Sequence, residues 1–242
     1  MSEKINTAVI LAAGMGSRLG KHNSNKPKGF IKLGVLPIIH ESINKLINSN
    51  LNNIIIVTGY KNELYDTYIK NNFSEVTIVK NLKYETTSTL FSLSKARHLI
   101  HDDFLLLESD IIYDSRAIDE LMYSHSRNTI LLSEQSGSGD EVFVETKNSI
   151  LINMSKNKAA LSKDIKGEFV GINKISIDLY TAMMDYFDKS ENKNNLTYEE
   201  DALVHCSNFI DIECLKIDDL LWSEIDTKEH LEKARIIYKD LN

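Results

Sequence analysis

The sequence predicts an α/β fold built on a doubly wound, mixed but mainly parallel sheet. In the first half, apolar segments of strand length alternate with segments whose apolar residues have helical spacing. The first strand, 7–11, is apolar on both faces, as expected of a parallel strand covered on both sides. A loop rich in glycine follows it, which places that loop at the edge where open α/β sheets bind ligands.

The expected elements follow in order along the chain. In the first half we expect strands at 7–11, 53–57, 75–79 and 104–107 and helices at 38–47, 63–71 and 88–98. In the second half we expect strands at 129–132, 141–145, 149–154 and 168–175, helices near 176–188 and 198–205, a strand at 209–217 and a helix from about 227 to 241. The closer spacing of these later strands predicts a small β/α subregion. We therefore expect one domain over 1–242 with three parts, about 1–128, 129–218 and 219–242.

Composition narrows the classes of function. The chain has 242 residues, 42% of them hydrophobic, and a formal net charge of −7. An acidic chain suits general nucleic-acid binding poorly, because neutralising phosphates needs a basic face. No apolar run approaches the roughly 20 residues of a membrane span, and the N-terminus has no signal-peptide architecture. Cys206 and Cys214 fit no zinc pattern, so we expect free thiols in a cytoplasmic protein with no nucleic-acid or membrane partner.

The loop after the first strand, Gly14-Met15-Gly16-Ser17-Arg18, has the properties of an anion site. Glycines let the backbone approach an anion and point N–H groups at it, and the Arg18 guanidinium suits phosphate oxygens. Further on, Pro27 stiffens the chain ahead of Lys28, a compact positive charge for a phosphoryl group. The loop is no Walker motif, and Leu19 stands where a dinucleotide fingerprint needs its third glycine. A simple tight turn is the alternative.

The segment Leu11-Ala12-Ala13-Gly14-Met15-Gly16-Ser17-Arg18-Leu19, followed by Lys26-Pro27-Lys28, resembles the signature of the nucleotidyltransferases that make sugar-nucleotides and CDP-alcohols. The resemblance implies a Rossmann-like nucleotidyltransferase fold, in which 1–128 binds the nucleotide and 129–218 the acceptor. It implies nucleotide contacts from Leu11, Ala12, Ala13, Gly14, Met15, Gly16 and Ser17. It also implies that Arg18 holds the β- and γ-phosphates and that Lys28 stabilises the α-phosphate under attack.

The resemblance also assigns a base-binding loop. In the family, the segment that corresponds to 81–90 contacts the base and ribose, so Thr87 and Ser88 are candidate contacts to the base. Their hydroxyls can equally cap the helix that follows. Hydrogen-bonding pattern alone does not distinguish cytosine from uracil here.

Two aspartates are candidate metal ligands. Asp110 follows the strand at 104–107, on the same sheet edge as the loop, and Asp226 precedes the last helix. Mg²⁺ takes one or two carboxylates together with substrate phosphates, and phosphoryl-type transfer needs such a cation. In the family that the chain resembles, aspartates at these two places bind Mg²⁺. A turn residue for Asp110 and an N-cap for Asp226 are the alternatives.

The acceptor site is predicted from a closer resemblance, to the short bacterial cytidylyltransferases that activate phosphocholine or 2-aminoethylphosphonate. Where an aromatic cage for a quaternary ammonium is expected, the chain has carboxylates in 141–143 and 198–201, and carboxylates suit a primary amine. The candidate acceptor residues are Glu141, Lys163, Glu168, Tyr198, Glu200 and Asp201. For 199–201 the alternative is the acidic first turn of a helix, and for Lys163 a solvated surface lysine.

The sequence therefore predicts a Mg²⁺-dependent cytidylyltransferase that uses CTP and a small amino-phosphonate or amino-alcohol phosphate, with 2-aminoethylphosphonate favoured. The acceptor would attack the α-phosphate in line and expel pyrophosphate, so no covalent nucleophile is needed. A phosphocholine cytidylyltransferase and a sugar- or polyol-phosphate nucleotidyltransferase are the alternatives. A catalytically silent nucleotide sensor is disfavoured by the joint presence of Arg18, Lys28, Asp110 and Asp226. Oligomeric state does not follow from the sequence.

Overall fold

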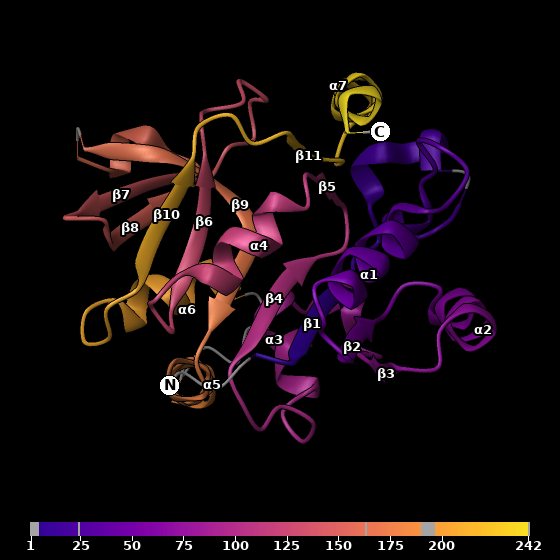
Figure 1. Cartoon of the computed structure of the whole chain (residues 1–242), viewed down its shortest axis with the longest axis horizontal. Coiled ribbons are helices and arrows are strands. Elements are labelled where there is room, and N and C mark those ends of the chain that lie inside the picture. The colour runs from indigo at the N-terminus through magenta and orange to yellow at the C-terminus, as the bar shows by residue number, and fades with distance from the viewer. Residues whose placement is uncertain (1–4, 24, 163, 190–196, 242) are drawn as a thin grey trace.

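The sheet is built from strands that alternate with helices through the first half of the chain. The computed structural model describes residues 5–23, 25–162, 164–189 and 197–241. Nine strands form one mixed sheet in the order β3-β2-β1-β4-β9-β6-β10-β8-β7 (Figure 1). The bounds are Thr7–Ala12 for β1, Asn53–Thr58 for β2, Val76–Lys80 for β3, Phe104–Glu108 for β4, Thr129–Ser133 for β6, Phe143–Lys147 for β7, Ile150–Ser155 for β8, Ile165–Ile175 for β9 and Glu213–Ile217 for β10.

The parallel strands lie mainly in 1–128, the part of the chain that is predicted to bind the nucleotide. Strands β3, β2, β1 and β4 are parallel neighbours, and β6 and β10 are parallel to each other. Strand β9 runs antiparallel between β4 and β6, and its first residues also pair with β7. The predicted doubly wound α/β fold with a mixed sheet is confirmed. The carboxyl ends of β1 and β4 are adjacent, which places Ala12 and Glu108 at one edge.

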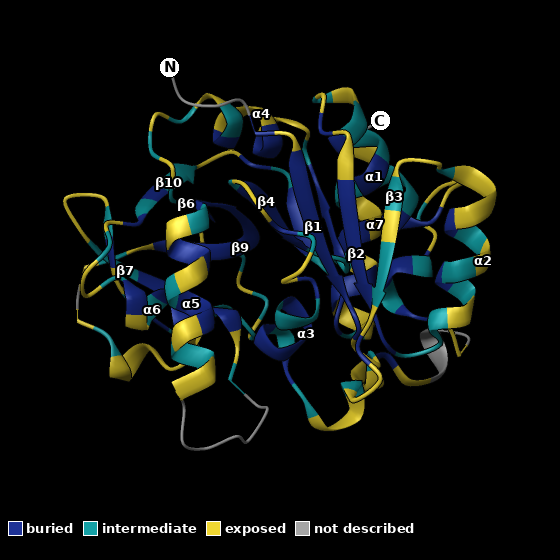
Figure 2. Ribbon diagram, turned by 90° about the horizontal axis from the view of Figure 1, so that it is seen from below, coloured by how far each residue is buried: buried dark blue, intermediate teal, exposed yellow. Residues whose placement is uncertain are grey.

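Helices cover both faces of the sheet. Their bounds are Ile38–Asn48 for α1, Asn62–Asn72 for α2, Thr89–Lys95 for α3, Arg116–Tyr123 for α4, Ile177–Lys189 for α5, Glu199–Cys206 for α6 and Lys228–Asp240 for α7. One buried cluster joins alternate residues of β1, such as Val9, to α3, α5 and α6. A second joins the intervening residues, such as Ile10, to α1, α2 and α4. The central strands are therefore buried on both sides (Figure 2), because side chains alternate between the two faces of a strand.

One element was predicted with the wrong bounds, and others were not predicted. The strand expected at 209–217 begins only at Glu213, because the chain after α6 turns, with the carbonyl of Cys206 accepting from the N–H groups of Phe209 and Ile210. Helix α4 was not predicted, nor was the two-stranded sheet of β5 (Ile111–Tyr113) and β11 (Trp222–Glu224).

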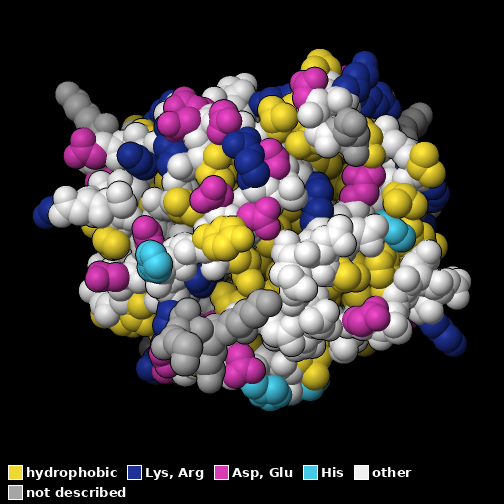
Figure 3. Space-filling view, viewed as in Figure 1, with side chains coloured by type: hydrophobic (Ala, Val, Ile, Leu, Met, Phe, Trp, Pro, Cys, Tyr) yellow, Lys and Arg dark blue, Asp and Glu magenta, His cyan; other side chains and the backbone are white. Residues whose placement is uncertain are grey.

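Charge is dispersed over the surface. On the face drawn in Figure 3, basic side chains lie among acidic ones and form no continuous stripe. Cys206 and Cys214 are buried free thiols, as expected. In the part of the chain that the structure describes, no helix is both long and apolar enough to cross a membrane.

Candidate active site

A cavity of about 710 Å³ opens at the carboxyl edge of β1 and β4. The loop after β1 and Lys28 form one wall. The other walls come from the loop before α3, the end of β4, the segment before β7, β9, α6 and the segment around β11. Segments far apart in the sequence therefore converge where an open α/β sheet binds ligands.

The glycine of the loop closest to Lys28 is needed for its conformation. Gly16 has φ +61°, and a Cβ built there would lie 2.7 Å from Cγ of Lys28. Any larger residue would contact the lysine, and its backbone would have a conformation that L-residues seldom adopt. Lys28 itself begins a short 3-10 helix directly after Pro27, which has extended backbone. The glycine and the proline thus fix how the lysine enters the cavity.

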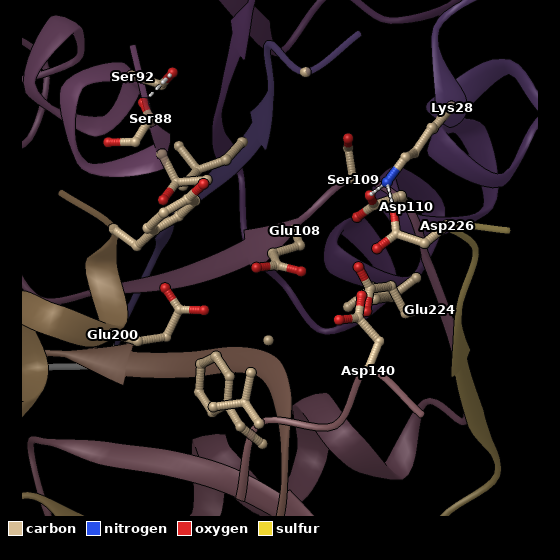
Figure 4. Close-up of a pocket in the computed structure, with 18 of the residues that line it drawn as sticks. Lys28, Ser88, Ser92, Glu108, Ser109, Asp110, Asp140, Glu200, Glu224 and Asp226 are labelled. Atoms are coloured by element: carbon tan, nitrogen blue, oxygen red, sulfur yellow. Dashed lines mark hydrogen bonds and ion pairs between the residues drawn. The ribbon is translucent and has the colours of Figure 1, made fainter. Parts of the chain in front are cut away.

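Asp110 and Asp226 meet because β5 and β11 pair. The two strands are antiparallel, with Glu224 opposite Ile111, and the N–H of Ile225 donates to the carbonyl of Asp110 at 2.9 Å. Asp226 is not the N-cap of α7: Thr227 caps that helix, with its hydroxyl accepting from the N–H of His230. The carboxylate of Asp226 is buried and points to Lys28 (Figure 4).

Cations and carboxylates alternate at this end of the cavity. Lys28 Nζ donates to Asp110 Oδ2 at 2.5 Å and also to Asp226 Oδ1. Arg18 donates to Asp226 and to Asp140. Burial alone would lower the pKa of Lys28, but the charges of Asp110 and Asp226 outweigh it and raise that pKa. Lys28 is therefore a fixed positive charge.

Glu224 and Asp226 are neighbouring carboxyl groups whose pKa values are shifted in opposite directions. Burial, a hydrogen bond with Asp226 and the charge of Asp110 raise the pKa of Glu224 to about 11. Burial would also raise the pKa of Asp226, but its hydrogen bond with Glu224 and the charge of Lys28 hold that pKa below its usual range. Asp226 is thus the charged member of the pair at neutral pH.

The same carboxylates form two sets that fit a metal ion. Glu108, Asp110 and Glu224 form one set, and Asp140, Glu224 and Asp226 form the other, with ligand atoms in each set within 4.8 Å of one another. The donors are all oxygens, which suits a hard divalent cation and not a thiol- or imidazole-preferring metal. The described residues therefore fit the predicted type of cofactor.

The segment before α3 is fixed by a buried amide. Asn81 Nδ2 donates to Thr87 Oγ1 at 2.9 Å and to Ser92 Oγ at 3.0 Å, and its Oδ1 accepts from the N–H of Lys83 at 2.9 Å. Thr87 and Ser88 both line the cavity. Ser88 Oγ, however, donates to the carbonyl of Thr197, which links this segment to the start of α6.

A second group of carboxylates lies at the opposite end of the cavity. In Figure 4, Glu200 faces the cavity from across the site, and Glu108 lies between it and Lys28. Glu199, 2% exposed, is hydrogen-bonded to Glu108. Among the described residues, Oε2 of Glu199 and Oε2 of Glu200 have no hydrogen-bond partner. Burial raises the pKa of both groups, and for Glu199 the charge of Glu200 adds to it.

The geometry can be compared with known proteins. Residues 8–162 match the family described as the MobA-like NTP transferase domain. The chain belongs to this family. The predicted resemblance to nucleotidyltransferases is therefore confirmed.

Three similar proteins illustrate the range of this nucleotidyltransferase family. The chain is 28% identical over 128 residues to CMP-5'-(3-aminopropyl)phosphonate synthase of Streptomyces rubellomurinus, which covers 52% of this chain and 20% of that protein. It is 31% identical over 120 residues to choline-phosphate cytidylyltransferase of Haemophilus influenzae, which covers 50% of each. The matches thus span a fifth to a half of these relatives. The inositol-1-phosphate CTP transferase of T. maritima has a TM-score of 0.84 at 16% identity, over 100% of this chain and 98% of that one, which shows the fold.

The structure of this nucleotidyltransferase brings most of the predicted residues to one cavity. The predicted residues that line it are Leu11, Ala12, Ala13, Gly14, Gly16, Arg18, Lys28, Thr87, Ser88, Asp110, Glu168, Tyr198, Glu200, Asp201 and Asp226. Met15 and Ser17 are outside the lining set, and Met15 is 41% exposed. Glu141 is also outside it, and its carboxylate accepts from the N–H of Gly139. Lys163 lies outside the described residues.

Two predicted acceptor residues have structural partners. The carboxylate of Glu168 accepts from Ser136, from its N–H at 2.5 Å and from its Oγ at 3.0 Å, and so holds the segment before β7. The carboxylate of Asp201 accepts from the N–H of Tyr198 at 2.9 Å in a capping box. This agrees with the alternative given for 199–201, the acidic first turn of a helix. Their roles with an acceptor stay predictions.

Sequence reasoning missed four charged residues of the site, namely Glu108, Asp140, Lys156 and Glu224. Glu108 and Glu224 each precede a predicted metal aspartate by two residues, and residues at that spacing share a face of an extended strand. That signal was available. Asp140 and Lys156 flank the β7–β8 hairpin, and no local pattern marks them.

Proposed function

We propose that this chain transfers CMP from CTP to a small amine-bearing phosphonate or phosphate, with 2-aminoethylphosphonate as the favoured acceptor, and releases pyrophosphate. The observation that carries the proposal is a pair of buried carboxylate oxygens that have no hydrogen-bond partner among the described residues, Oε2 of Glu199 and Oε2 of Glu200, of which Glu200 lines the cavity. A buried carboxylate without a partner is costly, and an ammonium with N–H donors would satisfy it.

The balance of charge in the cavity supports both a metal and a cationic acceptor. The lining carboxylates are Glu108, Asp110, Asp140, Glu168, Glu200, Asp201, Glu224 and Asp226, whereas the lining cations are Arg18, Lys28 and Lys156. The carboxylates near Lys28 suit a divalent cation, and we propose Mg²⁺ there. The carboxylates of the Glu200 end lie away from that set (Figure 4) and suit the amine.

The reaction needs positioning and charge, and no covalent intermediate. An oxygen of the acceptor phosphonate forms a bond to the α-phosphorus while the bond from that phosphorus to the bridging β-oxygen breaks, and pyrophosphate leaves with that electron pair. Lys28 would meet the charge that develops on the α-phosphate, and Arg18 would hold the β- and γ-phosphates. Bound Mg²⁺ supplies further neutralisation of phosphate oxygens. We propose Thr87 and Ser88 as contacts to the base.

The similar proteins agree with this class of acceptor. One is named for an aminopropylphosphonate product and another for choline-phosphate. Phosphocholine is the second candidate, because Phe169 and Tyr198 line the cavity and aromatic faces attract a quaternary ammonium. The division into parts 1–128, 129–218 and 219–242 and the cytoplasmic location stay predictions.

A matrix of pyrophosphate release tests the proposal. CTP and UTP are each combined with 2-aminoethylphosphonate, phosphoethanolamine, phosphocholine and glucose 1-phosphate in the presence of Mg²⁺. We expect the highest kcat/KM for CTP with 2-aminoethylphosphonate. Faster turnover with phosphocholine would contradict the primary-amine acceptor, and faster turnover with UTP would contradict the assignment of CTP.

A variant of the carboxylate pair tests the observation itself. Glu200→Gln keeps the shape and removes the charge, so KM for 2-aminoethylphosphonate should rise by about tenfold or more, the scale of one charge-assisted hydrogen bond. KM for CTP should stay within about twofold, because that end of the cavity lies opposite Lys28. Glu120→Gln, on an exposed position of α4, is the matched control and should change neither constant. An unchanged acceptor KM in Glu200→Gln would exclude the amine from this end.

A further inference from the structure

Helix α2 places a buried tyrosine at the wall of the cavity. Tyr65 is 1% exposed and belongs to the buried cluster that joins α2 to the sheet, and it also lines the cavity. A residue that only fills the core needs no hydroxyl group, and burying a hydroxyl group is costly unless it is hydrogen-bonded. The partners of this hydroxyl group therefore indicate what it does.

The hydroxyl group of Tyr65 joins two segments that carry charged residues of the site. It is hydrogen-bonded to the backbone of Gly29 and to the side chain of Ser109. Gly29 comes directly after Lys28, and Ser109 comes directly before Asp110. Lys28 and Asp110 are 82 residues apart in the chain and form an ion pair across the cavity. One uncharged group thus connects the backbone beside the ammonium to the backbone beside its carboxylate partner.

The turn after Lys28 is packed tightly against this tyrosine. A Cβ built at Gly29 would lie 2.7 Å from the hydroxyl oxygen of Tyr65 and 3.6 Å from the carbonyl oxygen of Ser109. The ring of Phe30 meets the ring of Tyr65 edge-on, with centroids 4.9 Å apart. The tyrosine therefore holds the turn both by its ring and by its hydroxyl group, and only the hydroxyl group reaches Ser109.

The Ser109 end of this connection is fixed to the central strand. The N–H of Ser109 donates to the carbonyl of Leu11, in β1, at 3.1 Å. The ammonium of Lys28, by contrast, is held by the carboxylates of Asp110 and Asp226. These are the groups that a metal ion would take and that a triphosphate would replace. The lysine therefore needs a support that substrates do not remove.

We propose that Tyr65 is a positioning residue, whose hydroxyl group keeps Lys28 and Asp110 in register while substrates replace the ion pairs between them. The proposal rests on the transferase reaction proposed above and adds a residue that acts through Lys28 and Asp110. Lys28 is proposed to meet charge that develops on the α-phosphate, so an error in its position affects the transition state more than the bound substrate. Loss of the hydroxyl group should lower kcat and leave KM nearly unchanged.

Steady-state kinetics of Tyr65→Phe measure this difference, with whichever acceptor of the four the wild type turns over fastest. We expect kcat to fall about tenfold and the KM for CTP to stay within about twofold. Tyr113→Phe is the matched control. Tyr113 is also 1% exposed and its hydroxyl group is 2.8 Å from Oγ of Ser42, but it does not line the cavity.

The control should lose a similar free energy of unfolding, because each variant gives up a buried hydrogen-bonded hydroxyl group. It should keep the wild-type kcat. Equal losses of kcat in Tyr65→Phe and Tyr113→Phe would overturn the proposal, because they would show a general effect on the fold. A rise in the KM for CTP without a fall in kcat would overturn it as well.

A second measurement needs neither turnover nor metal. Brief acetylation of the substrate-free protein with acetic anhydride, followed by mass spectrometry of its peptides, gives the relative rate at which each lysine reacts. The side chain of Lys28 is 14% exposed and paired with two carboxylates, so it should react slowly in the wild type. We expect it to react several-fold faster in Tyr65→Phe, relative to the other lysines, and no faster in Tyr113→Phe. An unchanged rate in Tyr65→Phe would overturn the proposal.

Ser109→Ala removes the same connection from its other end. Acetylation of Lys28 should again be faster, and the double variant with Tyr65→Phe should react no faster than Tyr65→Phe alone, because both changes remove one hydrogen bond. If Tyr65→Phe does not fold, Ser109→Ala decides the question, and an unchanged rate there would overturn the proposal. A wild type that turns over no acceptor of the panel would contradict the proposed function and leave the acetylation test intact.

Discussion

At the scale of single residues, the position of Lys28 depends on the absence of a side chain at Gly16. Gly16→Ala places a methyl group 2.7 Å from Cγ of Lys28 at φ +61°. We expect a loss of about 1 to 2 kcal/mol in the free energy of unfolding from the backbone strain. We also expect a fall in kcat of about tenfold or more, because the lysine must move. Chemical denaturation and pyrophosphate release measure the two effects.

Gly20→Ala separates strain from displacement. Gly20 also has positive φ, +51°, but an added Cβ meets nothing within 4 Å. This control should lose a similar free energy of unfolding and keep its kcat. A Gly16→Ala variant with unchanged kcat, or a Gly20→Ala variant with an equal loss of kcat, would show that Lys28 tolerates the methyl group.

Individual residues of the site also differ in whether the sequence predicts them. Arg18 and Lys28 were predicted because the loop is a contiguous motif whose chemistry is local. Asp110 and Asp226 were predicted from their places at element ends. The partners that decide their charge were not predicted, because Glu224 meets Asp226 and Asp140 meets Arg18 only through tertiary structure.

At the scale of elements, long periodic segments were predicted and short ones were not. Helix α1 and the strands of the parallel half have patterns that specify both type and place. Strands β5 and β11 have three residues each, too few to show a period, and they exist because they pair with each other. That pairing brings the two proposed metal aspartates together, so part of the site depends on strands that were not predicted.

The start of α5 depends on a charged contact that predicts a pH effect. Asp103 accepts from the N–H of Ile177 at 3.0 Å and from Nε and Nη2 of Arg127 at 2.8 Å. Burial would raise the pKa of Asp103, but Arg127 and the Ile177 N–H lower it below its usual value. Asp103→Asn should cost about 1 kcal/mol of unfolding free energy at pH 7, a modest figure because Arg127 is half-exposed.

The pH dependence of this cost follows from the sign of the shift. A carboxyl group whose folded-state pKa is depressed stabilises the fold above its unfolded-state pKa, about 3.9 for aspartate. That contribution is lost as the pH falls through the folded-state value. The difference between Asp103→Asn and the wild type should therefore be constant from pH 7 to about 5 and shrink below about 4. Urea unfolding across this range measures it, and a difference that grows on acidification would contradict the assignment.

At the scale of the whole molecule, the cavity joins segments from both halves of the chain through charged contacts. Lys28 and Asp110 belong to the first half, and Asp140 and Asp226 to the second. Lys28 lies between the two proposed metal aspartates, so a divalent cation alone must compete with its ammonium. A triphosphate gives Lys28 and Arg18 other partners and frees the carboxylates. Nucleotide and metal added together should therefore stabilise the fold, whereas metal added alone should hardly stabilise it.

Thermal unfolding checks this cooperation. CTP with Mg²⁺ at about 100 times Kd should add about 2.7 kcal/mol, which raises Tm by roughly 5 to 10 °C for a chain of this size. Mg²⁺ alone should shift Tm by less than about 2 °C, and a chelator should abolish most of the shift that CTP gives. Asp226→Asn should lose the joint shift, whereas Asp103→Asn, remote from the cavity, should keep it. If Mg²⁺ alone matched the joint shift, the metal would bind without displacing Lys28, and the exchange of partners inferred for these carboxylates would be wrong.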